Sequence, residues 1–250
     1  MTKRRQGMLI KLGKSLLMAI LILSLTGCGS LNKMQAKQIE EKLSEMYDGE
    51  KFEVLALGNR FGTLTNDTVT AFVKSKKTDV VFECQMNTDG EIVSNNYKGR
   101  LIETKIEVLL KENLKKQGIT SESLLFIFGG KDITTLNLNM EPSDYISDYS
   151  PEYVSGYLVL KENENLSGDA FLNGLRKTHE DLLNTPLQVN VWIISKENYD
   201  DLIGEFTKLP DISNSWFEEK ETISFLKLSI TNDGLNMNES EIGKLLQGGK

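Results

Sequence analysis

The spacing of apolar and polar residues predicts alternating helices and strands along most of the chain. Apolar residues recur at helical spacing in residues 33–47, and Gly49 ends this first helix. The clearest strand is residues 80–86, where apolar side chains alternate along one face, and Asp89-Gly90 predicts a tight hairpin turn after it. The strands predicted in this region are residues 51–57, 68–74, 80–86 and 91–97.

The same reading continues to the end of the chain. A long helix over residues 98–116 carries a buried apolar stripe and ends at Gly118. Another helix is predicted to begin after Ser195, which is a suitable N-cap residue. The remaining predicted elements are strands at residues 124–128, 133–140, 153–161, 187–194 and 222–231, a helix at 167–184, and a polar tail with a short helix at 232–250.

This order of elements predicts an α+β fold, because antiparallel hairpins and helices are interspersed and no doubly wound sheet is indicated. An acidic, aromatic stretch with two prolines spans residues 141–153 and is interpreted as a linker or an exposed excursion. We therefore predict two small modules of antiparallel sheet with packed helices, residues 33–140 and 141–250. The helix and strand meander of residues 33–97 resembles the cystatin-like modules of many Gram-positive surface lipoproteins, and this resemblance implies no functional residue.

The first 27 residues differ in composition from the rest. They contain five basic residues and no acid, followed by an apolar run at residues 16–23 and then small residues. This order is typical of a signal peptide. The apolar run is too short for a transmembrane helix, which needs about 20 residues. We predict that residues 1–27 are a signal peptide.

Leu25-Thr26-Gly27-Cys28 resembles the bacterial lipobox. The resemblance implies that diacylglycerol is transferred to the Cys28 thiol and that the chain is then cleaved before it, leaving residues 28–32 as a lipidated tether. Two acyl chains hold a protein firmly at a membrane, whereas one chain holds it only marginally. The alternative is an uncleaved signal anchor with an incidental cysteine. The expected location is the extracytoplasmic face of the cell membrane.

Net charge and cysteine content narrow the class of partner. Cleavage after residue 27 removes five of the 29 basic residues and none of the 36 acids, so the net charge changes from −7 to −12. Such a chain is repelled by phosphate backbones, and we expect no nucleic-acid partner. The charge suits a basic protein partner, or it serves only to keep the protein in solution. With Cys28 acylated, Cys84 has no cysteine with which to pair.

Residue types that carry catalysis or metal binding are sparse. His179 is the only histidine, and its position beside the apolar stripe of its helix favours a packed side chain over a ligand or a base. Cys84 lies on the apolar face of its strand, which favours a small buried residue over a redox thiol. We found no motif for a nucleophile, a zinc site or a cofactor, so we expect no catalytic residue, no metal and no cofactor.

One stretch is a candidate surface for binding a protein partner. Its candidate residues are Asp144, Tyr145, Asp148, Tyr149 and Tyr153. Tyrosines give a large contact area at low entropic cost, and the acids steer a basic partner. The alternative is an ordinary loop whose tyrosines pack locally.

These observations favour a non-enzymatic, lipid-anchored module that binds a protein partner, of the immunity or envelope-assembly type. A solute-binding lipoprotein is a second hypothesis. An envelope enzyme that works through paired carboxylates is a third, because such a pair needs no sequence motif.

Overall fold

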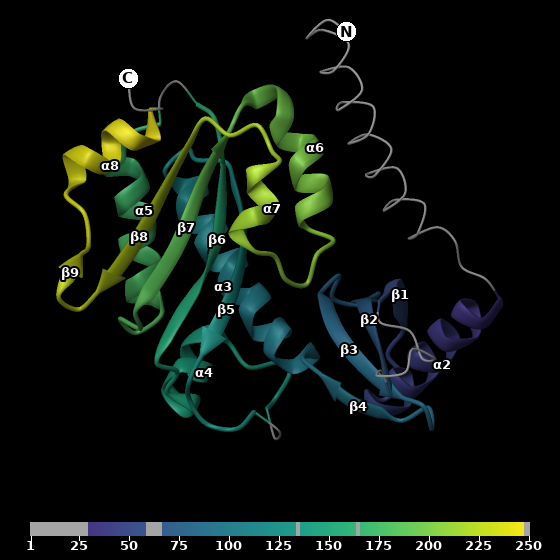
Figure 1. Ribbon diagram of the computed structural model, residues 1–250. Helices are drawn as coiled ribbons and strands as arrows, with labels where there is room; N and C mark the ends of the chain where they lie inside the picture. The colour runs from purple at the N-terminus through teal and green to yellow at the C-terminus, as the bar shows by residue number, and fades with distance from the viewer. Residues whose placement is uncertain (1–29, 59–66, 134–135, 164–165, 248–250) are drawn as a thin grey trace, which may run out of the picture. The chain divides into compact units, whose positions relative to one another are not determined.

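The computed structural model describes residues 30–58, 67–133, 136–163 and 166–247 (Figure 1). The chain divides into two compact units. The first runs through Asp79 and continues from Glu83 to Asn95, and the second comprises Val80–Phe82 and Asn96–Lys250. Each unit combines α-helical structure with its own β-sheet. The predicted α+β class with two sheets is confirmed.

The first unit is one helix on a four-stranded antiparallel meander. Its elements are α2 (Ser30–Met46), β1 (Phe52–Gly58), β2 (Thr68–Ser75), β3 (Val81–Asn87) and β4 (Ile92–Asn95), and the strand order is β1-β2-β3-β4. Every second residue of β2 is buried, from Val69 to Ser75, as expected for a strand with one face on a core. Ile39 and Leu43 of α2 are fully buried. The predicted order of helix and strands over residues 33–97 is confirmed.

The turn between β3 and β4 forms as the Asp89-Gly90 pair predicts. The backbone N–H of Gly90 donates to the carbonyl of Asn87, and Gly90 has a φ of +81°. The side-chain oxygen of Asn87 also accepts from the backbone N–H of Asp89 at 3.0 Å. Glycine adopts this left-handed backbone at little cost, which explains the choice of residue at this position.

The second unit contains a five-stranded sheet with helices on both faces. Its elements are α3 (Tyr97–Lys116), β5 (Ser121–Phe128), α4 (Pro142–Tyr149), β6 (Tyr153–Lys161), α5 (Gly168–Asp181), β7 (Leu187–Ile194), α6 (Lys196–Phe206), α7 (Asn214–Glu218), β8 (Ser224–Thr231), β9 (Gly234–Leu235) and α8 (Glu239–Leu246). The strand order follows the sequence, β5-β6-β7-β8-β9.

One strand pair differs from the prediction of purely antiparallel sheets. β6 and β7 are parallel, with Val154 opposite Leu187 and Lys161 opposite Ile194, whereas the other pairs in this sheet are antiparallel. Parallel neighbours require a long crossover connection, and α5 supplies it. The sequence pattern predicted β6, α5 and β7 individually, but it contained no signal for the direction in which they pair.

The two faces of this sheet are covered by different helices (Figure 1). One apolar core joins the sheet to α3, α5 and α8, with Leu110, Leu175 and Ile242 as members from the three helices. The other joins the opposite face to α6 and α7, where the ring of Trp192 stacks on Phe217 with 4.5 Å between centroids. Alternate residues of β7 serve the two cores, as the period of a strand requires.

The division between the units does not coincide with the predicted boundary at residues 140 and 141. β5 pairs along its whole length with β6, so the sheet joins segments on both sides of that boundary. Residue 133 and residues 136–140 do not form the predicted strand, and α4 occupies most of the predicted linker. The break in composition therefore reflects a short helix, and the division into units lies close to residue 95.

A buried ionic cluster fixes α3 along the free edge of β5. Arg100 donates to the carbonyl of Leu125 at 2.7 Å, and Glu107 accepts from the N–H of Leu125 at 2.8 Å. Glu103 accepts from the N–H of Ile127 at 3.0 Å. Arg100 also pairs with both carboxylates, at 2.8 and 3.0 Å. Side chains of α3 therefore satisfy backbone groups that an edge strand otherwise leaves open.

Candidate functional site

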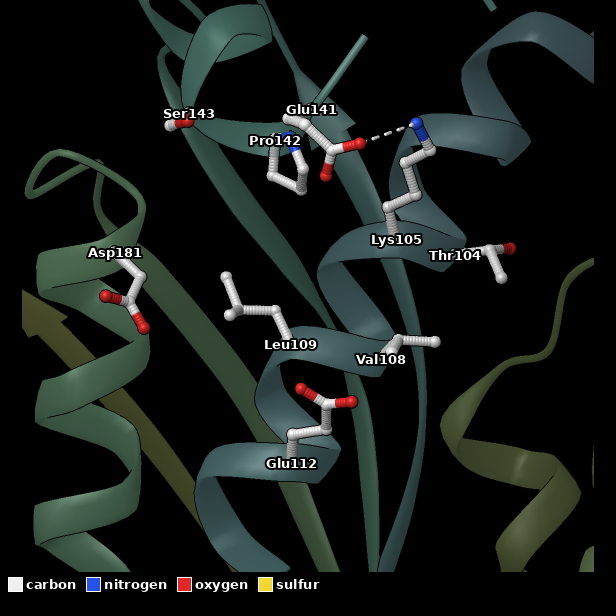
Figure 2. Close-up of a pocket in the computed structure, with 9 residues that line it drawn as sticks. All are labelled: Thr104, Lys105, Val108, Leu109, Glu112, Glu141, Pro142, Ser143 and Asp181. Atoms are coloured by element: carbon white, nitrogen blue, oxygen red, sulfur yellow. Dashed lines mark ion pairs between the residues drawn. The ribbon is translucent and has the colours of Figure 1, made fainter. Parts of the chain in front are cut away.

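A cavity of about 590 Å³ in the second unit is the candidate site (Figure 2). Three helices form it: the middle of α3, the start of α4 and the end of α5. Its lining residues are Thr104, Lys105, Val108, Leu109, Glu112, Glu141, Pro142, Ser143 and Asp181. The volume lies within the range of about 300–1,000 Å³ that is usual for ligand pockets.

The helical repeat of α3 presents these residues away from the ionic cluster. Arg100, Glu103 and Glu107 occupy the face against β5, whereas Lys105 and Val108 lie on another face and line the cavity. The ionic cluster on the first face therefore fixes the rotation of α3 about its axis, and with it the direction of the residues that line the cavity. Because the cluster is buried and hydrogen-bonded, this part of α3 is held in one orientation.

The start of α4 forms the second wall. Glu141 is the N-cap residue in an extended conformation, and Pro142 occupies the first turn, where its missing N–H costs no helical hydrogen bond. Lys105 ties this wall to α3, because its ammonium group donates to the carbonyl of Met140 at 2.6 Å and lies 3.5 Å from the Glu141 carboxylate. Figure 2 shows Lys105 reaching from α3 toward Glu141.

The rim of the cavity is acidic. Glu112, Glu141 and Asp181 contribute three carboxylates, of which Glu141 pairs with Lys105 and Asp181 pairs with Lys177. Burial opposes the ionisation of Asp181, but hydrogen bonds from Lys177 at 2.5 Å and Asn113 at 3.0 Å outweigh it and lower the pKa of Asp181. Asp181 therefore remains a fixed negative charge. A raised pKa is what a general acid needs, so Asp181 does not suit that role.

The floor of the cavity is apolar. Val108 is 49% exposed, and Leu109 and Pro142 are partly buried beside it. An apolar floor under a negative rim binds a ligand that combines a hydrophobic group with a positive charge. Val108 lies off the buried stripe of its helix, and its neighbours one helical turn away, Thr104, Lys105, Lys111 and Glu112, are polar. This exposed apolar position was a weak sign of the site in the sequence.

Helix α4 divides the side chains of the acidic, aromatic stretch, residues 141–153, into a buried set and an exposed set. Tyr145 is 4% exposed and belongs to the core, and its ring stacks on that of Tyr149 with 4.9 Å between centroids. The prediction that Tyr145 faces a partner is therefore wrong, because residues four apart share one helix face and this face packs inward. Asp144 and Asp148, also four apart, are exposed.

Tyr153 is half-buried at the start of β6, and its ring stacks on Phe128 with 4.8 Å between centroids. It lies beyond the end of α4 and does not line the cavity. The structure thus divides the five predicted residues among the core, the outer face of α4 and the sheet. The adjoining Glu141–Ser143 segment is the part of this stretch that forms the cavity.

The two residues singled out for possible chemistry are packed, as predicted. Cys84 is fully buried, and this burial, with a smaller effect of Glu83, raises the pKa of its thiol to about 12. His179 is 6% exposed, and burial lowers the pKa of its imidazole. Neither side chain lines the cavity. Cys28 and the predicted signal peptide lie outside the described residues.

The described parts of the chain contain neither a metal-binding cluster nor a membrane-spanning helix. Among these residues, no group of three or more His, Cys, Asp or Glu side chains is arranged to hold a metal ion. No described helix is long and apolar enough to cross a membrane.

Comparison with known proteins identifies a fold and no family. No protein-family model matches the chain, and no curated protein matches it. The structure is similar to the crystal structure of a DUF5037 family protein from Ruminococcus gnavus ATCC 29149, with a TM-score of 0.66 and 16% sequence identity. The match covers 85% of this chain and 99% of that chain. At this identity the similarity shows the α+β fold alone.

Proposed function

We propose that the protein is a lipid-anchored extracytoplasmic lipoprotein that binds a basic, amphipathic segment of a protein partner in the cavity between α3, α4 and α5. The observation that carries the binding proposal is the apolar floor under an acidic rim. The anchoring proposal rests on the basic and apolar leader that ends in Leu25-Thr26-Gly27-Cys28.

The position of the first helix supports a body held close to the lipid. α2 begins at Ser30, so only Cys28 and Gly29 of the predicted tether, residues 28–32, precede this helix. At about 3.5 Å per residue, two residues span roughly 7 Å.

Charge supports a basic partner over an acidic or neutral one. Three carboxylates line the cavity together with Val108 and Leu109, and two of them are paired with Lys105 and Lys177, which leaves Glu112 without an ion pair among the described residues. The chain without residues 1–27 has a net charge of −12. Long-range attraction brings a cationic segment to the cavity, and burial of its apolar side chains on Val108 and Leu109 then holds it. An anionic segment is repelled both during its approach and inside the cavity.

Anchoring is tested by metabolic labelling of bacterial cells with a clickable palmitate analogue. The full-length chain takes up label and partitions into the detergent phase, whereas Cys28→Ala takes up none. Cys84→Ala is the matched control and keeps the label, since Cys84 is buried. Labelling that persists in Cys28→Ala overturns the anchoring proposal.

Binding is tested by fluorescence anisotropy with a fluorescein-labelled peptide that carries Lys and Leu at helical spacing. A second peptide with Glu in place of every Lys is the ligand control. The full-length protein in detergent binds the first peptide and not the second. Glu112→Gln combined with Glu141→Gln weakens binding at least about tenfold, a loss of about 1.4 kcal/mol.

The matched control changes the same number of charges elsewhere. Glu45 and Glu162 are exposed and lie outside the cavity, so Glu45→Gln combined with Glu162→Gln leaves binding within about twofold. Equal losses in the two double variants show that overall charge alone attracts the peptide, and they overturn the assignment of the cavity.

The volume of the cavity also favours a second candidate, a solute-binding lipoprotein. A space of about 590 Å³ holds a small organic cation, with its charge on Glu112 or Asp181 and its apolar part on Leu109. Thermal-shift measurements across a panel of small amines separate the two candidates. A stabilising amine that also displaces the Lys-Leu peptide supports the solute-binding function.

A further inference from the structure

A second concave site lies on the opposite face of the same sheet. It is a groove of about 250 Å³, lined by Ser155, Gln188, Val189, Asn190, Lys227, Leu228, Ser229 and Asn236. We call these eight residues the polar groove. We propose that the polar groove binds a neutral oligosaccharide.

Strand register places the polar side chains of the groove in rows across the sheet. Ser155 is opposite Gln188, and Gln188 is opposite Ser229. Neighbouring strands are about 4.8 Å apart, so this row spans about 10 Å, the length of a disaccharide. Asn190 and Lys227 form the adjacent row. Their neighbours Val189 and Leu228 belong to the core on the other side, so the polar side chains share the outer face.

The far end of the groove is closed by a fixed side chain. The Asn236 side-chain oxygen accepts from the backbone N–H of Ser229 at 2.8 Å, and its amide group donates to the carbonyl of Lys227 at 3.3 Å. Gln188, by contrast, is exposed, and Asn190 is half-buried. Their amides each offer two donors and one acceptor, the combination that adjacent sugar hydroxyls or an acetamido group use.

Aromatic side chains adjoin the polar row at its other end. Phe126 is opposite Ser155 in the register of β5 and β6, and Tyr157 lies opposite Asn190. At the next level, Phe128 is 41% exposed and stacks on Tyr153. Phe126 and Tyr157 are packed against the core of α6 and α7, which leaves Phe128 as the exposed ring at this end. An exposed flat ring near a row of amides and hydroxyls matches the two surfaces of a pyranose, its C–H face and its hydroxyl edge.

Charge separates this ligand from the proposed ligand of the other site. The lining of the polar groove contains no carboxylate and one cation, Lys227, although the chain as a whole carries an excess of acids. A basic peptide gains nothing here and is attracted to the acidic rim of the α3, α4 and α5 cavity. A neutral glycan loses nothing to repulsion in the polar groove. The two sites lie on opposite faces of the sheet, so either proposal stands or fails alone.

The experiment is saturation-transfer difference NMR on the full-length protein in detergent, with the N-acetylglucosamine tetramer as the probe. We expect saturation of the acetyl and ring protons and a dissociation constant on the order of 1 mM or tighter. Gln188→Ala combined with Asn190→Ala weakens binding at least about tenfold. Gln188→Glu, which keeps the size of the side chain, also weakens binding because a carboxylate cannot donate the two N–H groups of the amide.

Gln117→Ala is the matched control, because Gln117 is an exposed glutamine at the end of α3, outside the groove. The affinity of this variant for the tetramer is expected to stay within about twofold of the wild-type value. Circular dichroism melting checks that each variant is folded. Absence of saturation transfer, or equal affinity in the double variant and the wild type, overturns the proposal. Binding of a sulfated tetrasaccharide alone also overturns it, since Lys227 by itself accounts for that result.

Discussion

At the scale of single residues, the buried ionic cluster of α3 consists of two carboxylates that share one arginine. The side chains of Arg100, Glu103 and Glu107 are 5%, 11% and 14% exposed. Burial raises the pKa of both glutamates, and the attraction of Arg100 offsets this only in part. Backbone N–H groups of β5 also bind the carboxylates, so the cluster is both an electrostatic and a structural element.

This burial predicts a specific dependence of stability on pH. Because the pKa of Glu107 is raised in the folded chain above its ordinary value of 4.5, the folded state binds the extra proton more tightly. Its contribution to stability is therefore complete below pH 4.5 and is lost as the pH rises through the folded pKa. Glu107→Gln removes this titration. Relative to the wild type, we expect the variant to gain stability as the pH rises.

The measurement is urea unfolding of both proteins at a series of values between about pH 4 and about pH 8. His179 titrates in the same window with the opposite sign, because its pKa is lowered, but it is present in both chains and cancels in the comparison. Parallel curves for the two proteins contradict the prediction.

Arg100→Met, which leaves both carboxylates without a cation, is expected to lower the free energy of unfolding by about 3–5 kcal/mol.

At the scale of elements, the close approach of α3 and α5 depends on one glycine. A Cβ atom added to Gly174 meets Leu114 Cδ2 at 2.8 Å and Leu114 Cα at 3.2 Å. Leu114 is fully buried in the core, so it has little room to move. The distance between these two helices fixes the spacing of the walls to which Leu109 and Asp181 belong.

Gly174→Ala is therefore expected to destabilise the second unit by about 1–3 kcal/mol through overpacking, despite the better helix propensity of alanine. Gly204→Ala is the matched control, because Gly204 is also inside a helix, α6, and has no atom within 4 Å of an added Cβ. It gains about 0.5–1 kcal/mol from propensity alone. Thermal melts that rise for both variants contradict the packing argument.

At the scale of the whole molecule, charge is distributed unevenly between the two sites. The cavity of α3, α4 and α5 carries three of the acidic residues, and the polar groove carries none. The surrounding chain adds to the negative potential of the first site, because acids outnumber basic residues by 36 to 29. Recognition at the first site is therefore expected to depend on long-range attraction.

This predicts that binding of the Lys-Leu peptide weakens with salt. Screening lengths fall from about 10 Å at 0.1 M to about 3 Å at 1 M, so the affinity decreases several-fold over that range and the association rate decreases with it. Stopped-flow anisotropy measures both. Binding of the N-acetylglucosamine tetramer serves as the internal control and stays nearly constant with salt. A peptide affinity that does not change with salt contradicts the charge argument.

The sequence by itself determined most elements of this protein, because helical and strand periodicities are local properties. Residues 153–161 and 187–194 were predicted with the bounds that the structure shows, and Gly118, the glycine predicted to end the long helix, follows the C-cap residue Gln117 of α3 with a φ of +76°. Burial of Cys84 and His179 also followed from their position on apolar faces. Ser195 was correctly placed at the start of α6, although its side chain makes no capping hydrogen bond.

Only the tertiary structure decided which elements are neighbours. The parallel pairing of β6 and β7, the inward turn of Tyr145 and the pairing of β5 with β6 across the predicted boundary depend on contacts between distant segments. The candidate cavity has the same origin, since α3, α4 and α5 contribute residues that are up to 77 positions apart. Periodicity shows that a residue faces inward or outward, but packing alone determines what it faces.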